Sequence, residues 1–169
     1  MRLSLRLKIG KYETVIDLKD YPRIKNRQLK IIWLGKKHTP YVALGGLYKG
    51  KRSWGNKQKQ VLLHRFLVRA QPFELIDHVD RDPFNNRQRN LRRCNRQQNG
   101  ANVGLSRANT TGYKGVSFKY PGKWSARIKV NYRKYHIGYF DSPEKAALAY
   151  NQIAQKVFGV FAGLNKIKL

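Results

Sequence analysis

Asp77 and His78 are neighbours in the stretch DHVDRDPFNNRQRN, and Asn99 follows further along the chain. Neighbouring side chains in an extended segment project to opposite sides, so the carboxylate can bind a metal ion while the histidine faces substrate. Residues 90–99 lack Gly and Pro and predict a helix that ends at Gly100, from which Asn99 can return an amide oxygen to the same ion. Two protein oxygens, with water and substrate phosphate, suit Mg²⁺. The pattern predicts metal-assisted phosphodiester hydrolysis, with His78 taking a proton from the attacking water.

The acidic residues around this pair admit two interpretations. Asp77, Asp80 and Asp82 lie close together in a chain that has only 9 acidic residues against 36 Lys and Arg, for a net charge of +27. Such a cluster weakens contact with a polyanion unless it holds a cation. The alternative is an ordinary Asp-rich turn.

The length and composition of the chain exclude several classes of protein. The 169 residues exclude a large multi-domain enzyme, and 41% hydrophobic with 12% aromatic residues exclude a disordered basic tail. The charge predicts a polyanionic partner. The single cysteine, Cys94, excludes an internal disulfide and a zinc ribbon. With no membrane-spanning apolar run and no readable export signal, we expect a soluble, cytoplasmic protein.

The chain divides into segments of different character. Residues 1–60 contain short β-like runs at 14–18, 28–34 and 41–48 and predict a small basic sheet. Residues 61–100 pass from an apolar element at 61–69 into a polar loop at 72–86. Residues 101–110 are small and polar, as in a linker.

Residues 111–169 alternate apolar and polar residues in three runs, 113–120, 123–130 and 133–140, which predict three strands. A helix follows, with Ser142 as N-cap, Pro143 in its first turn and Gly159 at its end. Because side chains alternate between the two faces of a strand, we expect one set of side chains to face the helix: Val116, Phe118, Trp124, Ala126, Ile128, Tyr135, Ile137 and Tyr139. The other set forms a face without acids: Ser117, Lys119, Arg127, Lys129, Lys134 and His136. That face predicts contact with a DNA groove or phosphates, and a merely solubilising surface is the alternative.

Two stretches resemble known families. LHRFLV with DHVDRDPFNNRQRNLRRCNRQQN resembles the HNH motif of phage and intron homing endonucleases. The run from NTTGYKGVSFKY to FAGLN is similar to the DNA-binding domain of plant AP-two/ethylene-response-factor proteins. HNH nucleases that carry this appended domain form a family of mobile-element endonucleases, so the resemblance implies a DNA endonuclease, cytoplasmic in the host cell if phage-encoded.

The HNH resemblance assigns roles to individual residues. It implies that Asp77 and Asn99 bind the divalent metal, Mg²⁺ first and Mn²⁺ as another candidate, and that His78 is the general base. It implies that Asn90 holds the ββα-metal loop and that Asn86 helps to order it. His64, followed by Arg65, matches the opening pair of the motif, in a catalytic role or in packing beside the loop. Arg81 stands where Gly is usual and Asn85 where Asp is usual.

The second resemblance places DNA contacts on the sheet, at Lys114, Ser117, Lys119, Arg127, Lys129, Lys134 and His136. Here Ser, Arg and His replace Arg, Glu and Trp of the plant domains, so the plant target sequence is not expected.

Taken together, the sequence predicts an α+β protein with a basic N-terminal β region (1–60), a central ββα-metal HNH motif (61–100), a linker (101–110) and an AP-two-like domain (111–169) of three antiparallel strands on one helix. The predicted function is a monomeric homing-type endonuclease that nicks or cuts double-stranded DNA at a semi-specific site with one divalent metal. The alternatives are a non-catalytic, sequence-specific DNA-binding regulator and a basic RNA-binding protein.

Overall fold

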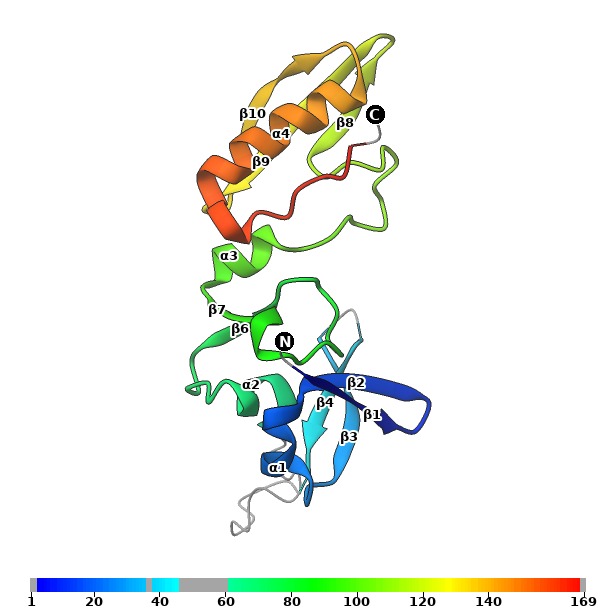
Figure 1. The fold of residues 1–169 in the computed structure, drawn as a ribbon. Coiled ribbons are helices and arrows are strands. Elements are labelled where there is room, and N and C mark those ends of the chain that lie inside the picture. The colour runs from blue at the N-terminus through cyan, green and yellow to red at the C-terminus, as the bar shows by residue number, and fades with distance from the viewer. Residues whose placement is uncertain (1–2, 36–37, 46–60, 168–169) are drawn as a thin grey trace, which may run out of the picture. The chain divides into compact units, whose positions relative to one another are not determined.

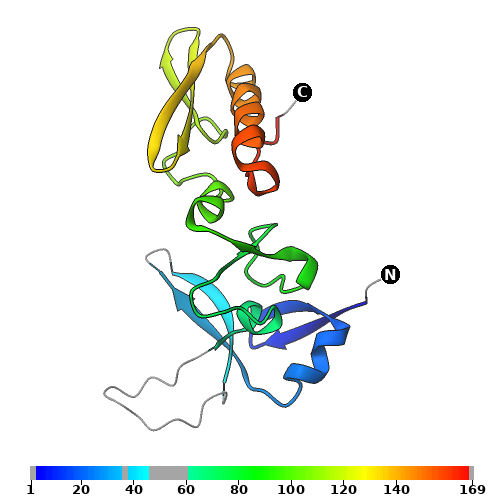
Figure 2. The same ribbon diagram turned by 90° about the vertical axis from the view of Figure 1, so that its left-hand side faces the viewer.

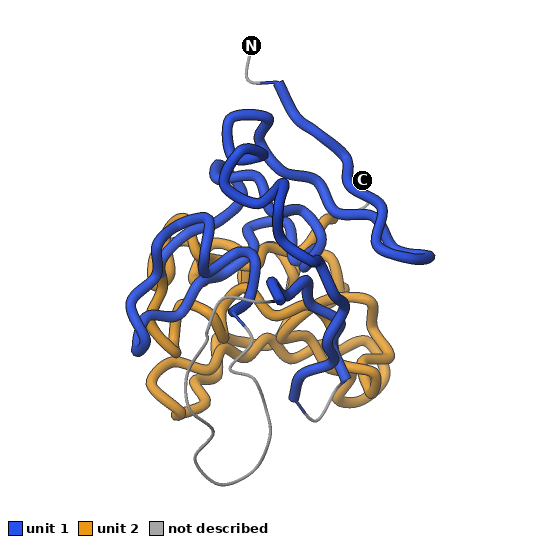
Figure 3. The backbone as a smooth tube through the Cα atoms, turned by 90° about the horizontal axis from the view of Figure 1, so that it is seen from below, with its two compact units in different colours: residues 1–93 blue, residues 94–169 orange. Residues whose placement is uncertain are grey.

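The computed structural model describes residues 3–35, 38–45 and 61–167, and Figure 1 shows its helices and strands. The architecture is mixed α+β with several small sheets, which confirms the predicted class. The chain forms two compact units, residues 1–93 and 94–169 (Figure 3). The predicted boundary at residue 60 lies outside the described residues, and the segment predicted as a linker, 101–110, belongs to the second unit.

The first unit begins with strands that share one core. β1 (Ser4–Ile9) and β2 (Tyr12–Asp17) form an antiparallel hairpin, and α1 (Tyr21–Ile24) follows a 3₁₀ turn at Leu18–Asp20. β3 (Leu29–Leu34), β4 (Thr39–Leu44) and β5 (Val61–Leu62) form an antiparallel sheet. The sequence runs at 14–18, 28–34 and 41–48 correspond to β2, β3 and β4, except that residues 46–48 lie outside the described part; β1 was not predicted.

The rest of the first unit is built onto that core. α2 (Leu63–Leu67), β6 (Leu75–His78) and β7 (Leu91–Cys94) follow, and β6 and β7 form a two-stranded sheet. The buried core draws on both halves of the unit: Ile16, Ile24, Val42, Leu44, Leu63, Leu67 and Leu91. Residues 61–93 therefore depend on the N-terminal strands for their packing.

The helix predicted over 90–99 is wrong in its first half. Gln88–Asn90 is a 3₁₀ turn and residues 91–94 are β7, because Leu91 is buried in the core and the Val79 amide donates to the Asn90 carbonyl at 2.9 Å beside β6. The helix α3 (Arg96–Ala101) begins only at Asn95. There the Asn95 side chain accepts from the Gln98 amide at 2.8 Å, and the Gln98 side chain accepts from the Asn95 amide at 2.9 Å.

The second unit is a three-stranded sheet with a helix on one face. β8 (Val116–Tyr120), β9 (Lys123–Val130) and β10 (Arg133–Phe140) are antiparallel in the order β10-β9-β8, and α4 (Pro143–Phe158) lies along one side of them (Figure 2). Ser142 caps α4 by accepting from the Lys145 amide at 3.1 Å. Gly115 has φ 77, and a Cβ there would lie 2.3 Å from the Tyr150 ring, so helix and sheet approach closely.

A β-bulge corrects the predicted faces of β10. The register shifts between His136 and Gly138, after which Gly138 pairs with Ala126 and Tyr139 pairs with Ser125. Tyr139 therefore lies on the face away from Ala126 and is 52% exposed, although simple alternation turned it toward the helix. Phe118 and Tyr135, also predicted to face α4, are about half exposed.

Candidate active site and cationic sheet face

Asp77 and His78 end β6, and both are buried. Arg92, on the paired strand β7, donates to Asp77 Oδ2 from Nε at 3.0 Å and from Nη2 at 2.7 Å. Such a charge-assisted pair fixes the orientation of the carboxylate and offsets part of its burial cost. Arg92 was not among the site residues predicted from the sequence.

His78 is oriented by Asn86. Asn86 Nδ2 donates to Thr14 Oγ1 at 2.8 Å and lies 3.3 Å from the carbonyl oxygens of Pro83 and Phe84, so the other end of its amide, Oδ1, faces His78 Nε2 at 3.3 Å. An amide oxygen accepts only, so Nε2 carries the proton and Nδ1 carries the lone pair. The imidazole is thus set in the tautomer that accepts a proton at Nδ1.

Burial keeps His78 neutral. Desolvation lowers the pKa of His78, and this outweighs the opposing effects of the Asn86 hydrogen bond and of the carboxylates of Asp80, Asp77 and Asp82. A neutral imidazole is the form that takes up a proton, so the site holds His78 in the state required of a base.

His64 and Tyr41 complete the surroundings of His78. The His64 ring lies edge-on to the His78 ring with centroids 5.0 Å apart, and the Tyr41 ring on β4 lies 5.6 Å from His64 and 6.4 Å from His78. Burial, followed by the charges of His78 and Arg65, lowers the pKa of His64 to about 3. Burial and the Asp77 charge raise the pKa of Tyr41. Tyr41 is a site residue that the sequence reasoning missed, since nothing in the run YVALGG links it to residues 77–78.

The loop between β6 and β7 is tied together by Asn90. Its Nδ2 donates to Asp80 Oδ1 and to the Asn85 carbonyl, each at 2.8 Å, and its Oδ1 accepts from the Asp80 amide at 3.1 Å. Asp80 Oδ1 accepts from the Asp82 amide at 2.9 Å, and Asp82 Oδ1 accepts from the Phe84 amide at 2.9 Å. Asp80 and Asp82 therefore form turns, which supports the alternative that these two acids belong to an ordinary Asp-rich turn.

Asp80 and Arg81 are shaped by the same turns. Partial burial raises the pKa of Asp80, but hydrogen bonds from the Asp82 amide, Asn85 and Asn90 outweigh it and leave the pKa below its ordinary value. Arg81 has φ 67, the left-handed conformation that favours glycine, and this is the position at which the HNH resemblance expects Gly. The arginine adopts the conformation at a cost of about 1 kcal/mol.

Arg65, the second residue of the predicted opening pair, forms hydrogen bonds to the backbone. Its guanidinium donates to the carbonyls of Glu74, Gln71 and Pro72, the last two at 2.6 and 3.2 Å. These bonds fix the turn that leads into β6. His64 is the member of the pair that contacts His78.

Asn99, the predicted second metal ligand, lies on α3 in the second unit and is exposed; its backbone amide donates to the Asn95 carbonyl at 2.9 Å. In the described part of the chain no three His, Cys, Asp or Glu side chains are gathered so that they could hold a metal ion. The Asp77 carboxylate of the first unit is a hard oxygen donor. This chemistry fits an ion such as Mg²⁺ that keeps most of its shell as water and phosphate.

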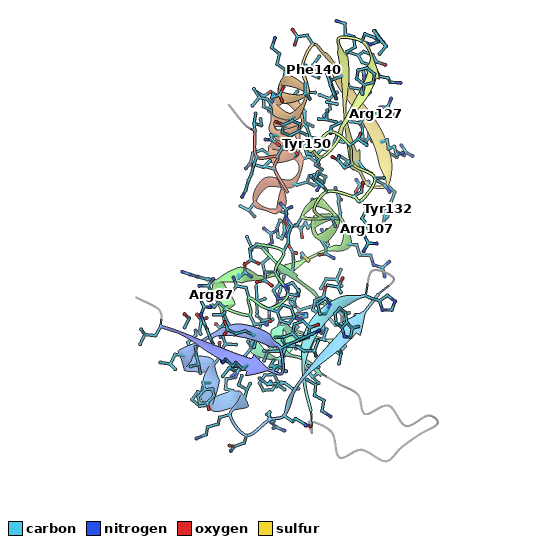
Figure 4. All side chains as sticks on the ribbon, turned by 90° about the vertical axis from the view of Figure 1, so that its right-hand side faces the viewer. Arg87, Arg107, Arg127, Tyr132, Phe140 and Tyr150 are labelled. Carbon is cyan, nitrogen blue, oxygen red and sulfur yellow. The ribbon has the colours of Figure 1, made fainter. Side chains whose placement is uncertain are left out.

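Most of the predicted DNA-binding residues lie on one face of the sheet, and one of them, Lys114, does not. Across the strands, Arg127 pairs with His136 and Lys129 with Lys134, and Ser117 lies opposite Ser125, so these five predicted residues share one exposed face of the sheet, away from α4. Lys119 is exposed at a register shift in β8. Figure 4 labels Arg127 on the sheet and Tyr150 on α4. Tyr139 pairs with Ser125 on the same face, and we group Lys119 with these residues as the cationic sheet face: Ser117, Lys119, Arg127, Lys129, Lys134, His136 and Tyr139.

Lys114 does not belong to the cationic sheet face. Its Nζ donates to the carbonyls of Ala101 and Val103, the latter at 2.8 Å. Its backbone amide donates to Asn165 Oδ1 at 2.6 Å, and its carbonyl accepts from Asn165 Nδ2 at 3.1 Å. Lys114 therefore fastens the C-terminal segment and the end of α3 to the start of the sheet.

Comparison with known proteins finds a distant relative. The chain is 29% identical over 136 residues to a protein described as an uncharacterized HNH endonuclease of Acanthamoeba polyphaga mimivirus, and the match covers 76% of this chain and 71% of that protein. No family model matches the chain. Within the described residues, no helix is both long and apolar enough to cross a membrane.

Proposed function

We propose that the protein is a DNA endonuclease of the HNH type. One observation carries the proposal: Asp77 and His78 are adjacent and buried, and each is oriented by a partner suited to it, Arg92 on the carboxylate and Asn86 on the imidazole. The similarity to a viral protein described as an HNH endonuclease supports the same assignment. The net charge of +27 suits DNA as the substrate.

His78 acts as the general base. A water positioned near Nδ1 loses its proton to the neutral imidazole and attacks the scissile phosphorus; the P–O3′ bond breaks, and the leaving 3′ oxygen takes a proton from solvent. Asn86 then accepts from Nε2–H of the imidazolium, so the ring keeps its orientation as the charge appears. Asn90 holds the shape of the loop that carries Asn85 and Asn86.

Asp77 is proposed to hold one divalent ion, Mg²⁺ or Mn²⁺; Asn99, the second ligand that the HNH resemblance implies, lies in the second unit. When bound, the ion would neutralise charge on the scissile phosphate and on the departing 3′ oxygen. Arg92 fixes the Asp77 carboxylate through Oδ2.

The cationic sheet face of the second unit is proposed to hold the duplex, in keeping with the AP-two/ethylene-response-factor resemblance. Phosphate contacts by its Arg and Lys would fix the register, and Ser117, His136 and Arg127 would face the groove. We further propose that the protein is a monomeric, homing-type enzyme that nicks or cuts at a semi-specific site.

Supercoiled plasmid carrying the native locus tests the proposal. Wild type, Asp77→Asn and His78→Ala are incubated with Mg²⁺, Mn²⁺ or EDTA, with substitutions of two exposed residues, Asp141→Asn and His38→Ala, as controls. Open-circle or linear product that needs metal, Asp77 and His78 but tolerates both controls is the expected result. Plasmid that is bound but stays intact under every metal would overturn the nuclease in favour of the DNA-binding regulator.

A further inference from the structure

Three aromatic rings in the first unit form a row that the proposed reaction does not use. Tyr12 at the start of β2 stacks on Phe84 of the β6–β7 loop, with centroids 5.4 Å apart and planes 13° from parallel. Trp33 near the end of β3 meets the edge of Tyr12, with centroids 6.3 Å apart and planes at 74°. We call Phe84, Tyr12 and Trp33 the aromatic row.

The inner end of the row is attached to the segment that orients His78. The Phe84 carbonyl accepts from the Val15 amide at 2.9 Å and from Thr14 Oγ1 at 2.7 Å. Thr14 Oγ1 in turn accepts from Asn86 Nδ2 at 2.8 Å, and Asn86 Oδ1 faces His78. The inner end of the row is thus connected to His78 through Thr14 and Asn86, and its outer end, Trp33, is exposed.

The outer end of the row is exposed and lies in positively charged surroundings. Trp33 is 52% exposed, and Lys11 Nζ lies 5.5 Å from the centre of the Tyr12 ring. Residues 3–35 contain eight Lys or Arg and three acids. Of these acids, Asp17 and Asp20 are buried, and Glu13 is paired with Arg6 at 2.9 Å.

These charges indicate which kind of partner would bind at the exposed Trp33 ring. A second copy of a chain of charge +27 would bring like charges together, whereas a nucleic acid supplies both a π-face for the indole and a phosphate for the lysine. Exposed aromatic rings beside cations are the recurring means by which proteins hold unstacked bases.

We propose that the aromatic row binds an unstacked nucleobase of the DNA strand that flanks the scissile phosphate. Trp33 is the stacking ring, and Lys11 contacts the adjoining phosphate. The inference rests on the proposed nuclease function for the position of the scissile phosphate, but the binding of a base at Trp33 can be measured without cleavage.

The test measures affinity for a duplex from the native locus in EDTA, with the full chain. Trp33→Ala is expected to weaken binding about tenfold, within the range found when an aromatic–base stack is removed. Trp33→Phe keeps a ring and should stay within about threefold of wild type. Lys11→Gln, at an exposed turn, should weaken binding about threefold. Phe73→Ala removes another exposed ring of the same unit, 86% exposed, and should leave the affinity unchanged.

A second readout is the tryptophan fluorescence itself. DNA should quench emission from wild type more than from Trp33→Phe, because the remaining tryptophans are common to both. Affinity of Trp33→Ala and Lys11→Gln equal to that of Phe73→Ala, with equal quenching of wild type and Trp33→Phe, overturns the inference. Thermal unfolding followed by circular dichroism identifies a variant that has lost its fold; Trp33→Phe and Lys11→Gln still decide the question if Trp33→Ala has.

The two proposals fail in different ways. If wild type never cuts but Trp33→Ala still weakens binding, the nuclease assignment fails and the base-binding row stands. If metal-dependent cutting needs His78 while the Trp33 variants bind and cut normally, the nuclease stands and the row fails.

Discussion

The two units use their polar side chains in opposite ways. In the described part of the first unit nine polar or charged residues are buried, and hydrogen bonds or, for His64, ring contacts connect them to one another or to the backbone: Thr14, Asp17, Asp20, His64, Asp77, His78, Asn85, Asn86 and Asn90. In the described part of the second unit, the buried polar residues are Asn102 and Ser125, and the cationic residues other than Lys114 are exposed. A reaction needs groups held in fixed positions before the substrate arrives, whereas DNA contact needs groups that water and phosphate can reach.

This difference sets what a substitution does in each unit. Removing one member of a buried hydrogen-bonded set leaves its partners unsatisfied, at about 1–3 kcal/mol each. Removing an exposed cation leaves the fold almost unchanged, within about 0.5 kcal/mol. The first unit should therefore respond in rate and stability, and the second in affinity.

The largest expected effect separates rate from binding. His78→Ala should lower the cleavage rate by about 10²–10⁴-fold, the usual contribution of a positioned base, while DNA affinity in EDTA stays at the wild-type value. Single-turnover cleavage and fluorescence anisotropy measure the two quantities. A His78→Ala protein that cuts at the wild-type rate would remove the proposed base and with it the contrast between the units.

The next effect tests the packing that presents the cationic sheet face. Gly115→Ala places a Cβ 2.3 Å from Tyr150 at φ 77, and we expect it to destabilise the second unit by about 3 kcal/mol or more. Gly112→Ala is the matched control, with φ 73 and open space around its Cβ, and should cost about 1 kcal/mol. Urea unfolding followed by circular dichroism compares them, and equal losses would contradict the close approach of α4.

The sequence allowed more to be predicted in the second unit than in the first. Alternation located β8, β9 and β10, and the Ser142 cap located α4, because these elements follow local rules. The bulge near Ile137 could not be read from alternation, since a period of two carries no sign of one extra residue. Tyr139 was placed on the wrong face for that reason.

In the first unit, tertiary packing decided the outcome. Residues 91–94 have a helix-compatible composition, yet Leu91 enters a core shared with the N-terminal strands. Asn86 and Asn90 were found through the motif, and the structure places them at His78 and across the loop. Tyr41 and Arg92 were missed because each comes from a separate strand that only the fold brings to Asp77 and His78.

The pH dependence of stability tests the buried histidine of the first unit. The pKa of His64 is lowered to about 3 from an ordinary 6.5, so the folded state binds its proton less well than the unfolded state. The free energy of unfolding should therefore be independent of this group above pH 6.5. It should fall by about 1.4 kcal/mol per pH unit between pH 6.5 and pH 3.

The His64→Gln variant isolates that slope, because His78 contributes in the same direction in both proteins. Urea unfolding of both proteins from pH 7 to pH 4 should show a steeper loss of stability for wild type. Parallel curves would mean that His64 titrates normally in the folded protein.

The smallest effect belongs to the cationic sheet face. Arg127→Ala should weaken DNA binding by about threefold to tenfold and leave both the unfolding free energy and the cleavage rate at saturating DNA unchanged. Anisotropy titration and single-turnover cleavage measure the split. A lower cleavage rate at saturating DNA would show that the second unit affects catalysis as well as DNA affinity.

Several of the basic side chains are occupied with the protein's own backbone. Arg23 donates to the carbonyls of Phe66 and Leu67, Arg65 to the 71–74 turn, Arg93 to the Val68 carbonyl and Lys114 to those of Ala101 and Val103. These cations add to the formal charge, but their N–H groups that donate to carbonyls are taken from phosphate contact, so they contribute less to counterion release when DNA binds. The number of ions set free on binding should therefore be well below what 36 Lys and Arg suggest.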